Sequence, residues 1–325
     1  MNTTASTLQR AGTVRPMMKR LVSLGIVWLA LVATAAGQQA LAPANDQPAR
    51  ISVDVDLVVL HATVTDRHGQ LVTDLTENNF KVYEDGVPQQ IRLFRHEDVP
   101  VAVGLVVDHS GSMLRKLSEV SAAARTFVHR SNPDDQMFVV NFNEKVSLGL
   151  PSAIPFSHNA TELESAILNA PAGGKTALYD AIATALEQVK ASTLDKKVLI
   201  VISDGGDNAS THTLKQILDL AEHSTAIIYT IGIYDEEDPD RNPRVLSRLA
   251  RVTGGQVFFP DKLSAVVDIC TRIARDIRNQ YTIGYVPTNP LRNGGYRTVR
   301  VVAQAPGKGR LFVRTRPGYI AQPAN

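Results

Sequence analysis

The chain has 325 residues, of which 44% are apolar and 20% are charged, a composition typical of a globular protein with room for several domains. This composition excludes a disordered tail, a collagen-like fibre and a polytopic membrane protein. The 34 basic and 32 acidic residues nearly balance, which argues against a dedicated nucleic-acid binder because such proteins carry a concentrated basic face. A single cysteine, Cys270, excludes an intramolecular disulfide framework and any multi-cysteine metal cluster.

Residues 1–37 have the three-part pattern of a secretory signal peptide. Lys19 and Arg20 precede an apolar run at 21–33, and small residues follow it as a cleavage site. An uncleaved N-terminal anchor is the alternative, but the apolar run is short for a membrane span. We therefore expect a secreted, periplasmic or cell-envelope protein with no membrane span after removal of the leader. Residues 38–50 are rich in Ala, Pro and Gln, which predicts a flexible linker.

Two segments on either side of the centre of the chain have the pattern of β-structure. In residues 51–97, period-2 alternation and β-branched residues predict strands at 51–65, 80–84 and 90–94, with a hairpin turn at Asp85 and Gly86. In residues 281–320, the same signals predict strands at 281–286, 296–303 and 311–315. Because three strands make only a marginal sheet, we expect the two segments to form one small β-sandwich-like module, with the residues between them inserted in it.

Residues 98–280 show a different pattern, in which strands alternate with helices. Apolar strands are predicted at 101–107, 137–142, 198–202, 226–233 and 256–259. Helices are predicted at 113–129, 177–189, 214–223, 245–252 and 263–277. The alternation predicts a doubly wound, mostly parallel α/β sheet, and the nearly continuous apolar strands indicate burial on both faces. Cys270 lies on the apolar stripe of the last helix, which predicts a buried structural thiol.

Oxygen-bearing side chains follow the buried strands of this region. Asp108, Ser110 and Ser112 come at the end of the first strand, Thr176 follows two glycines before a helix, and Asp204 follows a later strand. Because binding groups gather at the carboxyl ends of parallel strands, we expect these side chains to lie close together. Carboxylate and hydroxyl oxygens are hard ligands, so the set predicts a site for Mg²⁺, with Mn²⁺ or Ca²⁺ as alternatives, rather than for zinc.

Other types of site have less support. A P-loop needs a glycine at position 169, where the chain has Asn169. The acid, imidazole and hydroxyl at 108–110 are adjacent in sequence and cannot converge as a catalytic triad. The eight histidines lack the spacing of a zinc hydrolase. We expect His109 to be exposed on the loop of residues 108–112, here called the metal loop. Asp207 and Asn208 are expected to shape the loop after Asp204 rather than to bind the ion.

The ordered set Asp108-x-Ser110-x-Ser112, Thr176 and Asp204 resembles the metal-ion-dependent adhesion site of von Willebrand factor A domains. This resemblance covers roughly residues 99–280. It implies that Ser110, Ser112 and Thr176 are direct or nearly direct ligands, and that Asp108 and Asp204 act partly through water. It implies no enzymatic activity.

The flanking β segments extend the resemblance. Residues 80–86 and 281–290 are similar to the bacterial family named VWFA-related acidobacterial domain. In such a site the coordination of the ion is incomplete, so a protein ligand can offer an acidic side chain to it. We therefore expect a secreted or periplasmic, non-enzymatic binding or adhesion module, with no nucleic-acid partner.

Two other functions stay open on the sequence. One is a metal-assisted hydrolase at the same site, although a general base is not visible because both carboxylates are committed to the ion. The other is a structural envelope component with a vestigial metal site. The acidic residues at 235–240 are predicted to form a solvated loop, with an acidic rim that selects a basic partner as the alternative.

Overall fold

The structure is a computed structural model that describes residues 57–233 and 241–321. The predicted leader at 1–37, the linker at 38–50, the beginning of the first predicted strand and the acidic residues at 235–240 lie outside these ranges. None of the helices within the described ranges has the length and apolar character that crossing a membrane requires.

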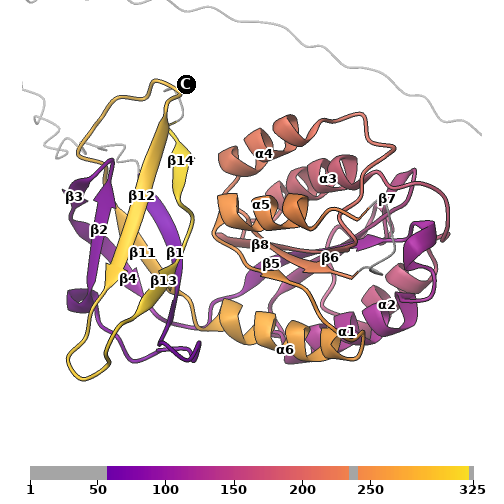
Figure 1. Ribbon diagram of the computed structural model, residues 1–325, viewed down its shortest axis with the longest axis horizontal. Helices are drawn as coiled ribbons and strands as arrows, with labels where there is room; N and C mark the ends of the chain where they lie inside the picture. The colour runs from indigo at the N-terminus through magenta and orange to yellow at the C-terminus, as the bar shows by residue number, and fades with distance from the viewer. Residues whose placement is uncertain (1–56, 234–240, 322–325) are drawn as a thin grey trace, which may run out of the picture. The chain divides into compact units, whose positions relative to one another are not determined.

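The central part of the chain forms a six-stranded sheet with the strand order β10-β9-β8-β5-β6-β7 (Figure 1). Its strands are β5 (Val101–Asp108), β6 (Gln136–Phe142), β7 (Val146–Leu148), β8 (Lys196–Ser203), β9 (Ile227–Gly232) and β10 (Val257–Phe258). Neighbouring strands are parallel, except that β7 is antiparallel to β6. Every residue of β5 and β9 is buried, as expected for strands that are covered on both faces.

Helices cover both faces of this sheet in the described part of the chain. They are α1 (Leu117–Arg130), α2 (Ala160–Leu168), α3 (Leu178–Lys190), α4 (Leu214–His223), α5 (Pro243–Thr253) and α6 (Ala265–Arg278). Helices α1, α2 and α6 pack on one face, and α3, α4 and α5 on the other (Figure 1). The side chains of β5 alternate between the two cores, with Val103 and Leu105 on the α1 side and Ala102 and Val106 on the α3 side. The predicted doubly wound sheet is confirmed.

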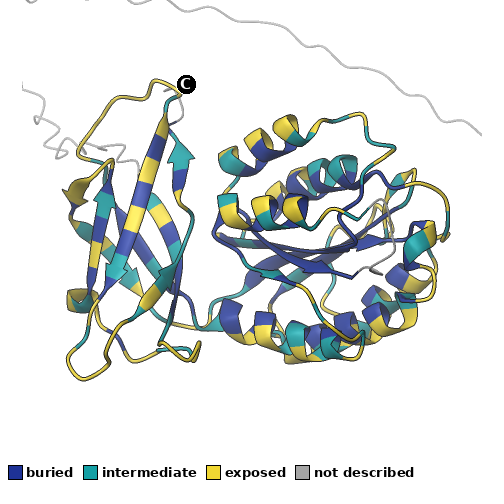
Figure 2. Ribbon diagram, in the orientation of Figure 1, coloured by how far each residue is buried: buried dark blue, intermediate teal, exposed yellow. Residues whose placement is uncertain are grey.

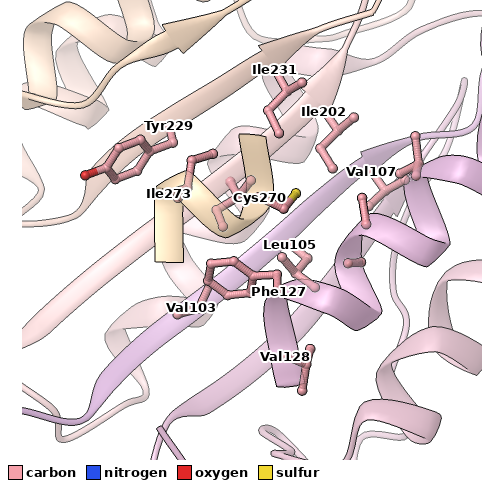
Figure 3. Packing of buried hydrophobic residues seen from close by; sticks show 14 of the residues in the cluster. Val103, Leu105, Val107, Phe127, Val128, Ile202, Tyr229, Ile231, Cys270 and Ile273 are labelled. Carbon is pink, nitrogen blue, oxygen red and sulfur yellow. The ribbon is translucent and has the colours of Figure 1, made fainter. Parts of the chain in front are cut away.

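The core beneath α1 and α6 is built mainly from aliphatic side chains, together with the aromatic rings of Phe127, Tyr229 and Phe258 (Figure 3). Cys270 and Ile273 of α6 pack there beside Leu105 and Ile202 of the sheet (Figure 3). Burial raises the pKa of the Cys270 thiol to about 12, so the thiol stays protonated. The prediction of a buried structural cysteine is therefore confirmed.

The flanking segments form two four-stranded antiparallel sheets, with the orders β13-β1-β11-β4 and β14-β12-β2-β3. The strands are β1 (Val58–Thr65), β2 (Phe80–Glu84), β3 (Val87–Gln89), β4 (Ile91–Arg95), β11 (Tyr281–Tyr285), β12 (Tyr296–Ala303), β13 (Phe312–Arg314) and β14 (Gly318–Ile320). Each sheet combines strands from before and after the α/β region, and the two sheets share one apolar core. The predicted β module built from both segments is thus confirmed, whereas the domain boundaries at residues 97 and 280 stay predictions.

Strand β12 shows how this core is made. Its buried and exposed residues alternate, which is visible as bands along the strand (Figure 2). Val299, Val301 and Ala303 face the shared core, and the residues between them face outward.

The course of the chain after the first hairpin differs from the prediction. Asp85 and Gly86 both have positive φ angles, 47° and 82°, and form the expected two-residue turn. The strand after this turn is β3, which ends at Gln89, and the chain then enters the other sheet as β4. The strand predicted at 90–94 corresponds to β4, whereas β3 was not predicted. Strands β7 and β14 were also missed, because three-residue strands carry little periodic signal.

Candidate functional site

The carboxylate of Asp108 lies at the carboxyl end of β5 and is fully buried. Its Oδ1 atom accepts a hydrogen bond from the backbone N–H of Ser110 at 2.8 Å. Its Oδ2 atom accepts one from the hydroxyl of Ser203 at 2.7 Å. Asp108 therefore holds together the loop that follows β5 and the end of the neighbouring strand β8.

The second carboxylate, Asp204, comes directly after β8 and is also buried. The hydroxyl of Ser112 donates to its Oδ2 atom at 2.5 Å, and the Oγ atoms of Ser112 and Ser110 are 3.2 Å apart. The N–H of Gly206 donates to Oδ1 of Asp204 at 2.9 Å. Four of the five predicted site residues thus belong to one hydrogen-bonded cluster.

Thr176 reaches the same place on a third loop, between α2 and α3. Its N–H donates to Oδ1 of Asn208 at 2.9 Å, and its carbonyl oxygen accepts from the N–H of Asn208 at 2.9 Å. The carbonyl oxygen of Gly174 accepts from the N–H of Gly111 at 3.2 Å. The Thr176 loop is therefore tied by backbone groups to both of the loops that carry the acidic residues.

The sharp course of this third loop depends on its glycines. Gly173 and Gly174 have φ angles of 120° and 81°, a conformation that other residues rarely adopt. A Cβ atom on Gly174 would also lie 2.6 Å from a carboxylate oxygen of Glu144, which lies against this loop. The glycine pair therefore permits the turn that brings Thr176 to the site.

The cluster contains two buried carboxylates, Asp108 and Asp204, and its other predicted ligands are uncharged hydroxyls. Burial, and to a smaller extent the nearby carboxylate of Asp204, raises the pKa of Asp108 from 3.8 to about 6, although hydrogen bonds from Ser110 and Ser203 oppose this shift. A divalent cation would supply the positive charge that the ionised pair lacks. The donor set of two carboxylates and three hydroxyls fits a hard cation. Within the described ranges, no three His, Cys, Asp or Glu side chains are grouped as a metal site, so a cation here would depend on hydroxyl donors beside the two carboxylates.

His109 is buried, with only 1% of its surface exposed, so the prediction of an exposed imidazole is wrong. The residue continues the alternation of β5 and points toward β6 and α2, where its Nε2 atom lies 3.0 Å from Oδ1 of Asn141. The Nδ2 atom of Asn141 donates to the carbonyl oxygen of Ala166, which leaves Oδ1 as the acceptor and makes Nε2 the donor. Burial lowers the pKa of this imidazole. The hydrogen bond of His109 therefore anchors the metal loop to strand β6.

Two loop residues have the shaping role that the sequence suggested. Asn208 binds both backbone groups of Thr176, as described above. Oδ1 of Asp207 accepts from the N–H of Tyr179 at 3.2 Å and from the hydroxyl of Ser210 at 2.5 Å. Ser203 was not predicted as a site residue, although its hydroxyl donates to Asp108 and fixes the orientation of that carboxylate. A polar residue at the carboxyl end of an otherwise apolar strand was the available signal.

A cavity of about 680 Å³ opens beside Ser112. Its walls come from the metal loop and the first residues after it, which include Leu114 and Arg115, and from the segment before α6, which includes Pro260 and Leu263. The sequence pattern did not indicate this cavity, since its two walls are about 150 residues apart in the chain.

The family profile of the von Willebrand factor type A domain matches residues 103–272. A search of curated proteins finds no match. Among solved structures, a von Willebrand factor type A protein from Catenulispora acidiphila is 14% identical, with 82% of this chain and 74% of that chain covered and a TM-score of 0.49.

Two further solved structures are similar over about half of the chain. An aerotolerance-related membrane protein from Bacteroides fragilis, which carries multiple mutations to serine, is 15% identical over 54% of this chain and 98% of that chain, with a TM-score of 0.44. The vWF domain of the type V pili tip protein Mfa5 from Porphyromonas gingivalis is 16% identical over 55% of this chain and 96% of that chain, with a TM-score of 0.45. The profile match alone spans just over half of the chain, and it coincides with the doubly wound sheet and its loops. The chain belongs to the von Willebrand factor type A domain family.

Proposed function

We propose that the chain is an exported, non-enzymatic binding module that captures a protein ligand through a divalent cation. The residues proposed to hold the cation are Asp108, Ser110, Ser112, Thr176 and Asp204. The observation that carries this proposal is the hydrogen-bonded cluster of Asp108, Ser110, Ser112 and Asp204 at the carboxyl ends of β5 and β8. These are the places where α/β sheets of this type bind their ligands.

The chemistry of the cluster suits an ion that is shared with a partner. Two carboxylates neutralise a divalent cation only formally, and the remaining protein donors are uncharged hydroxyls. An acidic side chain of the partner can therefore add both a ligand and a charge to the ion. Mg²⁺ suits this small set of hard oxygens best, with Mn²⁺ and Ca²⁺ as alternatives.

A metal-assisted hydrolase has less support at this site. Such an enzyme needs a general base that faces the ion and its bound water. The imidazole nearest to the cluster in sequence, His109, is buried and donates its Nε2–H to Asn141. Asp108 has a raised pKa, but both of its oxygens already accept hydrogen bonds within the loop framework. A structural envelope component with a vestigial site is distinguished from the binding module by the titrations described below.

The proposed location is the periplasm, the cell envelope or the outside of the cell. It rests on the signal-peptide pattern of residues 1–37. In the proposed organisation, a linker at 38–50 precedes the β module of 51–97 and 281–320, which carries the binding domain at 98–280.

Calorimetric titration of Mg²⁺ and Mn²⁺ into the purified protein tests the proposal. We expect Asp108→Ala and Asp204→Ala to abolish cation binding, and Thr176→Ala to weaken it less because a neutral hydroxyl contributes less attraction than a carboxylate. Asp195→Ala is the matched control, because this exposed acid precedes the amino end of β8, opposite to the site. Equal cation binding by the wild type and Asp108→Ala would contradict the proposal. Partner capture that persists in EDTA would instead indicate the structural component.

A further inference from the structure

A second cavity, with a volume of about 260 Å³, is lined by residues of helix α6 and of strands β1 and β13. It also borders Gln256, which directly precedes β10. The cavity is therefore at the edge of the central sheet where parallel strands begin, whereas the predicted cation ligands follow the ends of β5 and β8. A ligand bound here is separate from the proposed cation.

Three arginines line this cavity, and one of them is paired with the only carboxylate of the described walls. Arg314 forms an ion pair with Asp276 and also donates to the carbonyl oxygen of Gly254 at 3.0 Å. Arg272 and Arg275 are exposed, and neither forms an ion pair within the described part of the chain. The walls therefore carry two guanidinium groups in excess of their acid.

Other charges near the cavity do not cancel this excess. Among the described residues close in sequence to the walls, two are acidic and two are basic: Asp66, Asp268, Arg67 and Arg310. The carboxylate of Asp66 accepts hydrogen bonds from the N–H groups of its own turn. The local balance stays positive.

The acids outside the described ranges are attached to the chain at other places. The acids at 235–240 follow β9 in the sequence, and β9 ends at the edge of the sheet opposite to Gln256. The residues before β1 join this strand at Val58, whereas Thr63 and Thr65, near its other end, line the cavity.

The groups in excess are arranged to meet one ligand. Arg272 and Arg275 are three residues apart on α6 and thus on one side of the helix. The Cζ atom of Arg272 lies 5.5 Å from the centroid of the Phe258 ring, which orients its planar guanidinium. The side chains of Thr65 and Gln256 form no hydrogen bond to a described residue, so they add a hydroxyl and an amide donor to the walls.

These donors match a phosphate ester better than a carboxylate. A phosphomonoester carries a charge of about −1.5 to −2 at neutral pH and has three strong acceptor oxygens, whereas a carboxylate has one charge and two oxygens. Two guanidinium groups and the neutral donors satisfy the phosphate in both respects.

The cavity also has room for the molecule that carries the phosphate. Its volume equals that of about nine water molecules, more than a phosphate group alone fills. Leu71 and the ring of Phe312, which is 45% exposed, give it an apolar wall. We propose that this cavity binds the phosphate ester of a small polyhydroxylated molecule such as a sugar. The phosphate contacts Arg272 and Arg275, and the C–H groups of the sugar pack on Phe312.

Isothermal titration calorimetry of the purified protein in EDTA tests this inference with three probes: glucose 6-phosphate, inorganic phosphate and glucose. We expect glucose 6-phosphate to bind most tightly, inorganic phosphate to bind more weakly because it leaves the apolar wall uncovered, and glucose not to bind measurably. Arg272→Gln and Arg275→Gln should each weaken binding of glucose 6-phosphate about tenfold, because each removes charge-assisted hydrogen bonds. Arg248→Gln is the matched control, since it removes an exposed arginine from α5, on the other face of the sheet.

The inference is overturned if the wild type does not bind glucose 6-phosphate, or if neither Arg272→Gln nor Arg275→Gln weakens this binding. Equal affinity for glucose and glucose 6-phosphate would show that the phosphate is not recognised. Equal affinity for inorganic phosphate and glucose 6-phosphate would contradict a sugar phosphate as the ligand. Because EDTA removes divalent cations, none of these results depends on the proposed function.

Discussion

Replacement of Asp108 by asparagine measures how much the buried charge of this residue destabilises the cation-free protein. In the cation-free protein, the pKa of Asp108 rises from 3.8 to about 6, mainly because the carboxylate is buried. Two pKa units correspond to about 3 kcal/mol at neutral pH, where the acid is ionised in both the folded and the unfolded chain. Asp108→Asn removes this cost. The amide retains an acceptor for the N–H of Ser110 and can donate to Ser203, whose own hydroxyl proton loses its acceptor at a cost of about 1 kcal/mol.

The net expectation is that Asp108→Asn raises the free energy of unfolding by about 2 kcal/mol at pH 7.5 in EDTA. The sign follows from the raised pKa: between pH 4 and 6 the folded protein holds a proton that the unfolded chain releases. The Asp108 contribution to stability is therefore present below about pH 4 and is lost as the pH rises through about 6. At pH 4 the stabilising effect of the variant should disappear, and only the cost of the altered hydrogen bonding should remain.

Urea denaturation of both proteins at pH 4 and pH 7.5 measures this effect, with Asp195→Asn as a surface control. Addition of Mg²⁺ should reverse the order at pH 7.5. At one hundred times the dissociation constant, the ion stabilises only the wild type, by about 2.7 kcal/mol. The reasoning is wrong if Asp108→Asn is less stable than the wild type at pH 7.5 in EDTA, or if the difference between the two proteins is the same at both pH values.

Three further predictions concern the β module, the core and the leader. Glu84→Gln should destabilise the protein by about 3 kcal/mol in urea denaturation, because it leaves the buried Arg297, 3.0 Å from Glu84, without its counter-charge. A similar loss of stability for Glu77→Gln, which changes an exposed acid, would contradict that explanation. Cys270 should stay unmodified by a thiol reagent at pH 8 until urea unfolds the chain, and rapid labelling of the native protein would show that the thiol is accessible. Protein purified from its native compartment should lack tryptophan emission, because the only tryptophan, Trp28, lies in the predicted leader; such emission would mean that the leader is retained.

Much of the fold could be predicted because its signals are local. Buried parallel strands are continuous apolar runs, and the helices that cover them have an apolar stripe. The alternation of strands and helices from residue 98 to 280 can therefore be predicted from the sequence. Helix α4 and strand β12 have the bounds that the pattern predicted, Leu214–His223 and Tyr296–Ala303. The short strands β3, β7 and β14 were missed because pairing with a neighbour, rather than periodicity, defines them.

The candidate site also has features that local sequence signals predict and features that depend on tertiary packing. By itself, the sequence determined the family, the class of fold and the loops on which Asp108, Thr176 and Asp204 lie, since strand ends and glycine turns are written in consecutive residues. Only the tertiary structure decided that His109 turns inward to Asn141, because the pleat of β5 continues past its last paired residue. Tertiary structure alone also placed Leu114 opposite Leu263, since their proximity depends on how α1 and α6 pack on one face of the sheet.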